Sequence, residues 1–181
     1  MEITVHPDGR LVWPGGSFRC SLGRGGIRLD KREGDGATPV GSFPLRRVLW
    51  RPDRLERPDT GLPVQPIAPD DGWCDDPADP AYNRPVKRPH AASHEELWRE
   101  DGVYDVIVVM GHNDEPVVPG LGSAVFLHVT RPAAAPAAAD ADAPAWEPTA
   151  GCVALPLPDL LRLLKDCGPG TVLTVLDPAA G

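Results

Sequence analysis

The sequence predicts a mainly β protein, a β-sandwich or barrel-like sheet with one or two short helices and long loops. Short runs rich in Val, Ile, Leu, Phe and Thr recur along the 181 residues and are bounded by Gly, Pro or Asp. The 23 prolines and 19 glycines are spread without period, which favours a turn-rich β protein over disorder. The length suits a single domain, residues 1–181, with a real hydrophobic core.

The predicted strands are short and evenly distributed, a spacing typical of a sandwich or barrel. They are Glu2–His6, Arg10–Trp13, Ser17–Gly23, Ser42–Trp50, Tyr104–Gly111, Ala124–Thr130 and Thr171–Leu176.

The clearest helix spans Pro158–Cys167, with Pro and Asp in its first turn and Gly168 as its stop. Its leucines form a broad apolar face that we expect to pack on the sheet. A second, shorter helix is predicted over Ser93–Glu100, because Ser93 and Glu96 have the spacing of a capping box.

Two segments are predicted to be irregular. Residues 51–89 combine many prolines and acidic residues with little periodicity, which predicts a long surface loop or lid anchored by Trp73 and Tyr82. Residues 132–148 are rich in Ala and Pro and predict a flexible surface insertion of low complexity.

The net charge of −8 argues against a nucleic-acid partner, because phosphate binding depends on Lys and Arg. No membrane span is expected, since the longest apolar runs, such as residues 106–110, are far shorter than the ~20 residues a bilayer requires. The N-terminus has neither the basic nor the apolar region of a secretory signal, so the sequence as written predicts a cytoplasmic protein.

The four cysteines, Cys20, Cys74, Cys152 and Cys167, show no C-x-x-C pair, and no disulfide framework is expected. Cys20, Cys74 and Cys167 are interpreted as structural. His90 and His94 stand four apart, as on one helix face, but no third ligand is evident. We therefore expect neither a metal nor a cofactor.

Cys152 follows a glycine and lies downstream of His128, which sits in a strand-like run. A free thiol has a pKa of about 8.5, so a nucleophilic cysteine needs a nearby base, and imidazole is the usual one. There are two alternatives. Cys152 could be a structural cysteine, and His128 could be a core histidine whose hydrogen bonds are all made within the protein; both side chains would then lie in the core. Pairing with the Gly-Cys motif favours a functional role for His128, whereas spacing alone does not decide the role of Cys152.

The motif Thr149-Ala-Gly-Cys-Val-Ala-Leu155, the strand histidine and the upstream Thr38-Pro-Val-Gly-Ser-Phe43 resemble the L,D-transpeptidases of the YkuD type, proteobacterial branch. The resemblance extends from about Ser17 to Leu176. Two positions depart from it: many members have His where this chain has Ala150, and Arg or Asn where it has Ala154.

The resemblance implies that Cys152 carries a thioester, that His128 moves the proton and that the Val129 carbonyl orients His128. The N–H groups around Gly151 and Cys152 would then hold the oxyanion, and Thr149 either bonds near the nucleophile or caps the turn.

Three further residues are candidates for substrate binding. His112 and Asn113 follow a predicted strand and contact substrate or form an ordinary turn, and Arg24 faces a substrate carboxylate or solvent.

The resemblance therefore implies acyl transfer on peptidoglycan stem peptides or precursors, with acylation of the cysteine by carbapenems. If water resolves the thioester, the enzyme is instead a carboxypeptidase or amidase. A catalytically weak peptidoglycan-binding module is the third interpretation, and an unusually reactive Cys152 thiolate would argue against it. The family's usual location is the periplasm or cell envelope.

Overall fold

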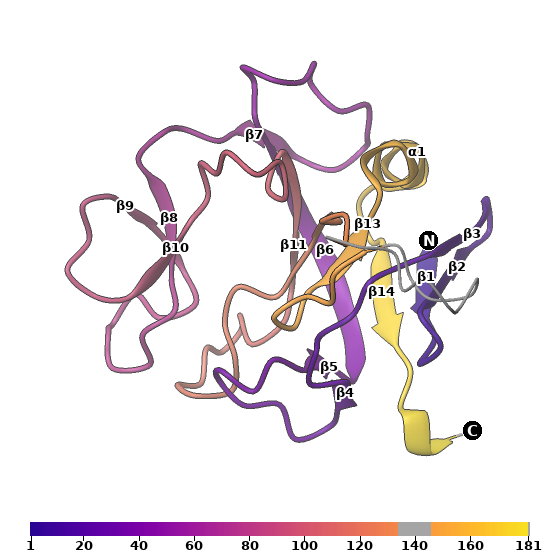
Figure 1. Cartoon of the computed structure of the whole chain (residues 1–181), viewed down its shortest axis with the longest axis horizontal. Helices are drawn as coiled ribbons and strands as arrows, with labels where there is room; N and C mark the ends of the chain where they lie inside the picture. The colour runs from indigo at the N-terminus through magenta and orange to yellow at the C-terminus, as the bar shows by residue number, and fades with distance from the viewer. Residues whose placement is uncertain (134–145, 181) are drawn as a thin grey trace.

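The fold is described from a computed structural model for residues 1–133 and 146–180 (Figure 1). The elements in chain order are β1 (Glu2–Val5), β2 (Arg10–Trp13), β3 (Gly16–Arg19), β4 (Ile27–Arg28), β5 (Thr38–Pro39), β6 (Gly41–Trp50), β7 (Val64–Pro66), β8 (Asp71–Cys74), β9 (Pro85–Lys87), β10 (His94–Glu96), β11 (Val106–Met110), β12 (Phe126–Val129), β13 (Val153–Leu155), α1 (Leu157–Asp166), β14 (Val172–Val175) and a 3₁₀ turn (Pro178–Ala180).

The main sheet has the strand order β13-β12-β11-β6-β14-β1-β2-β3, with β7 added beside β6. The long strand β6 joins its two halves, because its first residues pair with β14 and its later residues with β11. The segment after β3 then returns to β13, where Ser21 and Ala154 exchange backbone hydrogen bonds of 2.8 and 2.9 Å. The sheet is thereby nearly closed, and the prediction of a mainly β, barrel-like fold is confirmed.

The core lies between this sheet and α1. Val106 and Val108 of β11 and Leu127 of β12 are fully buried on one face, and Leu160, Leu163 and Leu164 of α1 are buried as well. Burying each such side chain contributes about 1.5–3 kcal/mol. The predicted helix is therefore present, one residue earlier at each end than the sequence indicated.

The predicted helix over Ser93–Glu100 is wrong. Its central residues form β10, which pairs antiparallel with β8 in the register His94 opposite Cys74 and Glu96 opposite Gly72. A segment this short is marginal as an isolated helix, so pairing with a neighbouring strand outweighs the capping signal.

Residues 51–89 are more regular than the predicted loop or lid. They contain β7 and also β8 and β9, which form with β10 a separate three-stranded sheet (Figure 1). Trp73 and Tyr82 are buried, as expected for anchors. The predicted insertion over 132–148 falls mostly outside the described residues, but Pro132 and Trp146 at its ends form a β-bridge.

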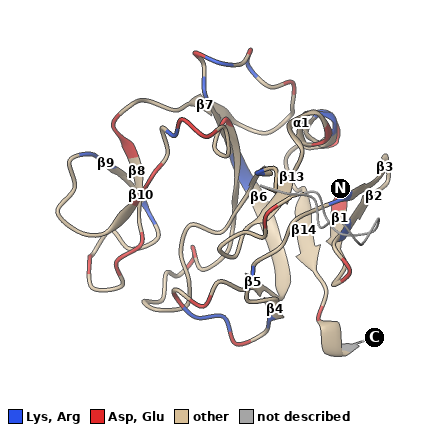
Figure 2. Ribbon diagram, viewed as in Figure 1, with Lys and Arg blue, Asp and Glu red and all other residues tan. Residues whose placement is uncertain are grey.

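Acidic and basic residues are interspersed over the fold in the view of Figure 2. In the described part of the chain, all helices are too short or too polar to cross a bilayer.

Arg51 fixes residues 98–99, and Arg99 lines the pocket described below. Its side chain is 2% exposed, its guanidinium donates two 2.8 Å bonds to Asp53 and one to the Arg99 carbonyl, and it lies 3.7 Å over the Trp98 ring. We expect Arg51→Met to lower the free energy of unfolding by about 2–3 kcal/mol. This is below the range for a fully buried ion pair, because Asp53 is half exposed.

Urea denaturation measures this change. The exposed Arg57, replaced in the same way, should shift the free energy of unfolding by no more than about 0.5 kcal/mol. Equal effects of the two substitutions would contradict the anchoring role of Arg51.

Candidate active site

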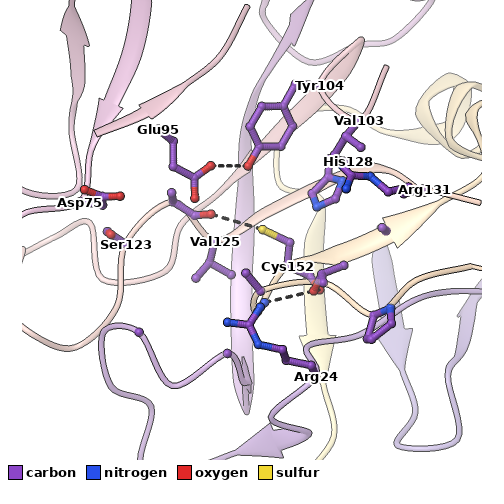
Figure 3. Close-up of a pocket in the computed structure, with 18 of the residues that line it drawn as sticks. Arg24, Asp75, Glu95, Val103, Tyr104, Ser123, Val125, His128, Arg131 and Cys152 are labelled. Carbon is purple, nitrogen blue, oxygen red and sulfur yellow. Dashed lines mark hydrogen bonds between the residues drawn. The ribbon is translucent and has the colours of Figure 1, made fainter. Parts of the chain in front are cut away.

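A cavity of about 460 Å³ is lined by both Cys152 and His128 (Figure 3). His128 stands on β12, and Cys152 ends the turn that leads into β13. The two strands pair in parallel with His128 opposite Ala154, which brings the thiol and the imidazole to the same side of the cavity.

The Cys152 thiol is 7% exposed and has two backbone partners. Its Sγ–H donates to the Ala124 carbonyl at 3.3 Å, and the Phe126 N–H donates to Sγ at 3.3 Å. Burial raises the pKa of Cys152 to about 12, so the resting group is a thiol. The reactive Cys152 thiolate that would argue against a binding module therefore has to form during the reaction and not at rest.

His128 is 6% exposed, and its Nδ1 lies 2.8 Å from the Val129 carbonyl oxygen. Because a carbonyl only accepts, Nδ1 carries the proton and Nε2 of the neutral ring is left as the basic nitrogen. Burial lowers the pKa of His128 to about 4. The resting pair is thus a neutral thiol and a neutral imidazole.

The turn before Cys152 is held by Thr149. The Thr149 hydroxyl accepts from the Gly151 N–H at 3.1 Å and donates to the Cys152 carbonyl at 2.7 Å. Gly151 adopts φ +139°, and a Cβ atom there would lie 2.8 Å from the Ala37 carbonyl oxygen. Thr149 therefore caps the turn, and the Gly151 N–H, one of the donors predicted for the oxyanion, is already bonded.

The model of the YkuD family, described as the L,D-transpeptidase catalytic domain, matches residues 2–175. The chain belongs to this family. No curated protein and no solved structure matches the chain significantly. The family match covers both the cysteine turn and the strand histidine, as well as nearly all of the main sheet.

At the two positions where this chain departs from many family members, the pocket wall carries only the methyl side chains of alanine. Ala150 and Ala154 both line the cavity; Ala154 is buried, and its backbone pairs with that of Ser21. Neither contributes a functional group.

The rigidity of Gly151 can be tested by Gly151→Ala. We expect this substitution to lower the free energy of unfolding by about 1–3 kcal/mol. The new Cβ would meet the Ala37 carbonyl, and the φ of Gly151 lies outside the range of L-residues. Gly170→Ala is the matched control: its φ is +79°, but nothing lies within 4 Å of the added Cβ. Thermal unfolding of the two variants should therefore differ, and an equal loss would show that the Ala37 contact carries no cost.

Asn83 is a site residue that sequence reasoning missed. Its Oδ1 accepts from Trp73 Nε1 at 3.0 Å and from the Ala124 N–H at 3.1 Å, and its Nδ2 donates to the carbonyls of His112 and Asn113. It holds Ala124 in the left-handed region, φ +50°, where the Ala124 carbonyl meets the Cys152 thiol. Asn83 lies in residues 51–89, which the sequence predicted to be a surface loop or lid, and no local pattern there indicates this role.

Glu95 and Tyr104 are two further site residues that the sequence did not predict. The Tyr104 hydroxyl donates to the Glu95 carboxylate, and both side chains line the cavity (Figure 3). Burial raises the pKa of Glu95 and that of Tyr104. The Tyr104 ring packs edge-on against His128 with centroids 5.4 Å apart, so Tyr104 helps to position the imidazole that the sequence predicts as the base.

Both signs of charge line the cavity. The acidic residues are Glu33, Asp75, Glu95 and Glu147, and the basic ones are Arg24, Lys31, Arg99 and Arg131. Lys31 is buried and bonded to Asp35. Arg24 also lines the cavity, and its contact with substrate stays a prediction.

His112 and Asn113, the other predicted substrate contacts, are not among the residues that line this cavity. His112 Nε2 bonds the Leu121 carbonyl at 3.0 Å. The Asn113 side chain bonds the backbone of Val118 and Gly122. Both residues brace the loop that carries Ala124 toward Cys152.

Proposed function

We propose that this protein is a cysteine acyltransferase of the L,D-transpeptidase type, which processes peptidoglycan stem peptides through a thioester on Cys152. Family membership supports action on peptidoglycan, and members of this family generally work at the cell envelope. The observation that carries the proposal is the placement of Cys152 and His128 in one cavity, with the basic nitrogen of His128 left available.

The neutral resting pair dictates how attack begins. When substrate enters, the thiol leaves the Ala124 carbonyl, Sγ bonds to the amide carbonyl carbon, and its proton passes to His128 Nε2. The Phe126 N–H, which already donates to sulfur, stabilises the developing thiolate. The imidazolium then protonates the leaving amine as the tetrahedral intermediate collapses to the thioester.

The oxyanion requires backbone donors near the nucleophile. Because the Gly151 N–H is bonded to Thr149, we assign this role to the Cys152 N–H. Thr149 and Gly151 contribute by fixing the turn that presents it. An acceptor amine then attacks the thioester and regenerates the thiol.

The charged lining supports a zwitterionic peptide as substrate. Stem peptides carry both amine and carboxylate groups, and a cavity with both signs of charge can pair with each. Arg24 lies on the cavity wall as a partner for a carboxylate, and Glu95 as a partner for an amine.

Two assays test the proposal with the purified chain. Incubation with a carbapenem should add one drug mass per chain, located at Cys152 by peptide mapping. Incubation with a disaccharide-tetrapeptide should release the terminal residue and give a crosslinked dimer. Shortened monomer without dimer would instead favour a carboxypeptidase, and the absence of both adduct and turnover would favour a binding module.

A further inference from the structure

A second cluster of reactive side chains lies outside the acyl-transfer site. Cys74 ends β8, Asp79 belongs to the turn that follows, and His90 follows β9. One ligand atom from each, sulfur, carboxylate oxygen and imidazole nitrogen, lies within 4.8 Å of the other two. None of the three lines the catalytic cavity, so the proposed function leaves the cluster unexplained.

The donor types fit a tetrahedral transition metal, and so does the separation between His90 and Asp79. Zinc takes thiolate, imidazole and carboxylate ligands, with bonds of about 2.0–2.3 Å. Tetrahedral angles then separate a nitrogen and an oxygen ligand by about 3.4 Å. His90 Nε2 and Asp79 Oδ2 are 3.5 Å apart. In the described ranges, His90 Nε2 is also a buried nitrogen with no hydrogen-bond partner.

The backbone around the cluster is fixed before any ion binds. The Cys74 N–H bonds the Arg84 carbonyl at 2.9 Å, and the Asn83 N–H bonds the Cys74 carbonyl at 2.9 Å, which closes the intervening loop at its base. Asp79 Oδ1 accepts from the Ala81 N–H at 2.7 Å, so the carboxylate is oriented while Oδ2 faces His90. A preorganised site of this kind loses little entropy on binding.

We propose that Cys74, Asp79 and His90 bind one Zn²⁺ ion, with water in the fourth position. From the sequence, only His90 and His94 form a candidate pair, and no metal is expected. His94 lies on β10 instead, and the other two members of the cluster come from β8 and the loop that follows it. Asp75, next to Cys74, and Glu95, on the strand paired with β8, line the catalytic cavity. A bound ion therefore stabilises β8, which Asp75 directly follows, and the strand paired with it, which carries Glu95.

The test uses Co²⁺ as a spectroscopic probe, followed by Zn²⁺ displacement. The Cys152→Ala variant is the background, so that the catalytic thiol cannot bind the metal. We expect one Co²⁺ per chain, a thiolate-to-cobalt charge-transfer band, and loss of that band in Cys74→Ser. Zn²⁺ at 100 times its dissociation constant should raise the melting temperature by about 5–10 °C.

Matched variants separate ligation from general loss of structure. Asp79→Asn and His90→Gln should weaken Co²⁺ binding by about tenfold or more. Asp76→Asn should change it by less than about twofold, because Asp76 caps the same loop, through the Ala78 N–H, without belonging to the cluster. Circular dichroism verifies that each variant is folded.

Absence of the charge-transfer band would overturn the proposal. So would a band that persists in Cys74→Ser, or equal effects of the Asp79 and Asp76 substitutions. These results are independent of acyl transfer, because the background variant lacks the catalytic thiol.

Discussion

Cys152→Ala is expected to abolish carbapenem acylation and turnover while leaving the protein folded. In the proposed mechanism the Cys152 sulfur forms the thioester, and no other cysteine is among the described residues that line the cavity. The substitution removes only sulfur from a site where Sγ makes two weak backbone bonds of 3.3 Å. We expect no adduct by intact-mass analysis and no detectable product from a disaccharide-tetrapeptide.

Two other buried thiols provide the controls. Cys20 and Cys167 are both buried and free, and Cys167 Sγ bonds the Leu163 carbonyl at 3.3 Å, a geometry similar to that of Cys152. Their alanine variants should retain the adduct and the activity. An adduct that survives in Cys152→Ala but disappears in one of these variants would assign the nucleophile elsewhere.

Most of the main sheet could be predicted because its strands have local signals. Apolar runs bounded by Gly, Pro or Asp located β1, β2, β6, β11, β12 and β14 to within two residues at each end. The three-stranded sheet could not be predicted, because short strands such as His94–Glu96 are defined by their pairing partner rather than by their own sequence.

The site divides in the same way. The predicted part of the site consists of a recognisable motif, which contains Thr149, Gly151 and Cys152, and of the strand histidine His128. The structure places these residues together. Asn83, Glu95 and Tyr104 come from segments far from that motif, and only tertiary packing brings them to the cysteine. The sequence left open whether His112 contacts substrate or forms an ordinary turn, and in the structure its ring is bonded to the Leu121 carbonyl.

His128→Gln is expected to lower the acylation rate by roughly 10²- to 10⁴-fold, the range for loss of general acid–base catalysis. Because the resting thiol has a pKa of about 12, little thiolate exists at neutral pH without the imidazole. Glutamine keeps a polar side chain near the Val129 carbonyl but cannot accept the proton. Single-turnover acylation by a carbapenem, followed by mass spectrometry, measures the rate.

The same variant has a pH signature that separates a buried neutral histidine from an exposed one. The folded pKa of about 4 lies below the ordinary value of 6.5, so between these values the unfolded chain binds the additional proton. Stability therefore falls as the pH is lowered from 6.5 toward 4, by on the order of 3 kcal/mol from this group. In His128→Gln that contribution disappears, and urea midpoints should fall less steeply over this window.

His112→Gln is the matched control for the rate, because His112 is a half-buried histidine that lies outside the residues that line the cavity. Its acylation rate should stay within about threefold of wild type, since a residue that only braces a loop takes no part in proton transfer. A larger rate loss in His112→Gln than in His128→Gln would mean that the base is the wrong histidine. An unchanged pH profile of stability in His128→Gln would mean that His128 is not held neutral by burial.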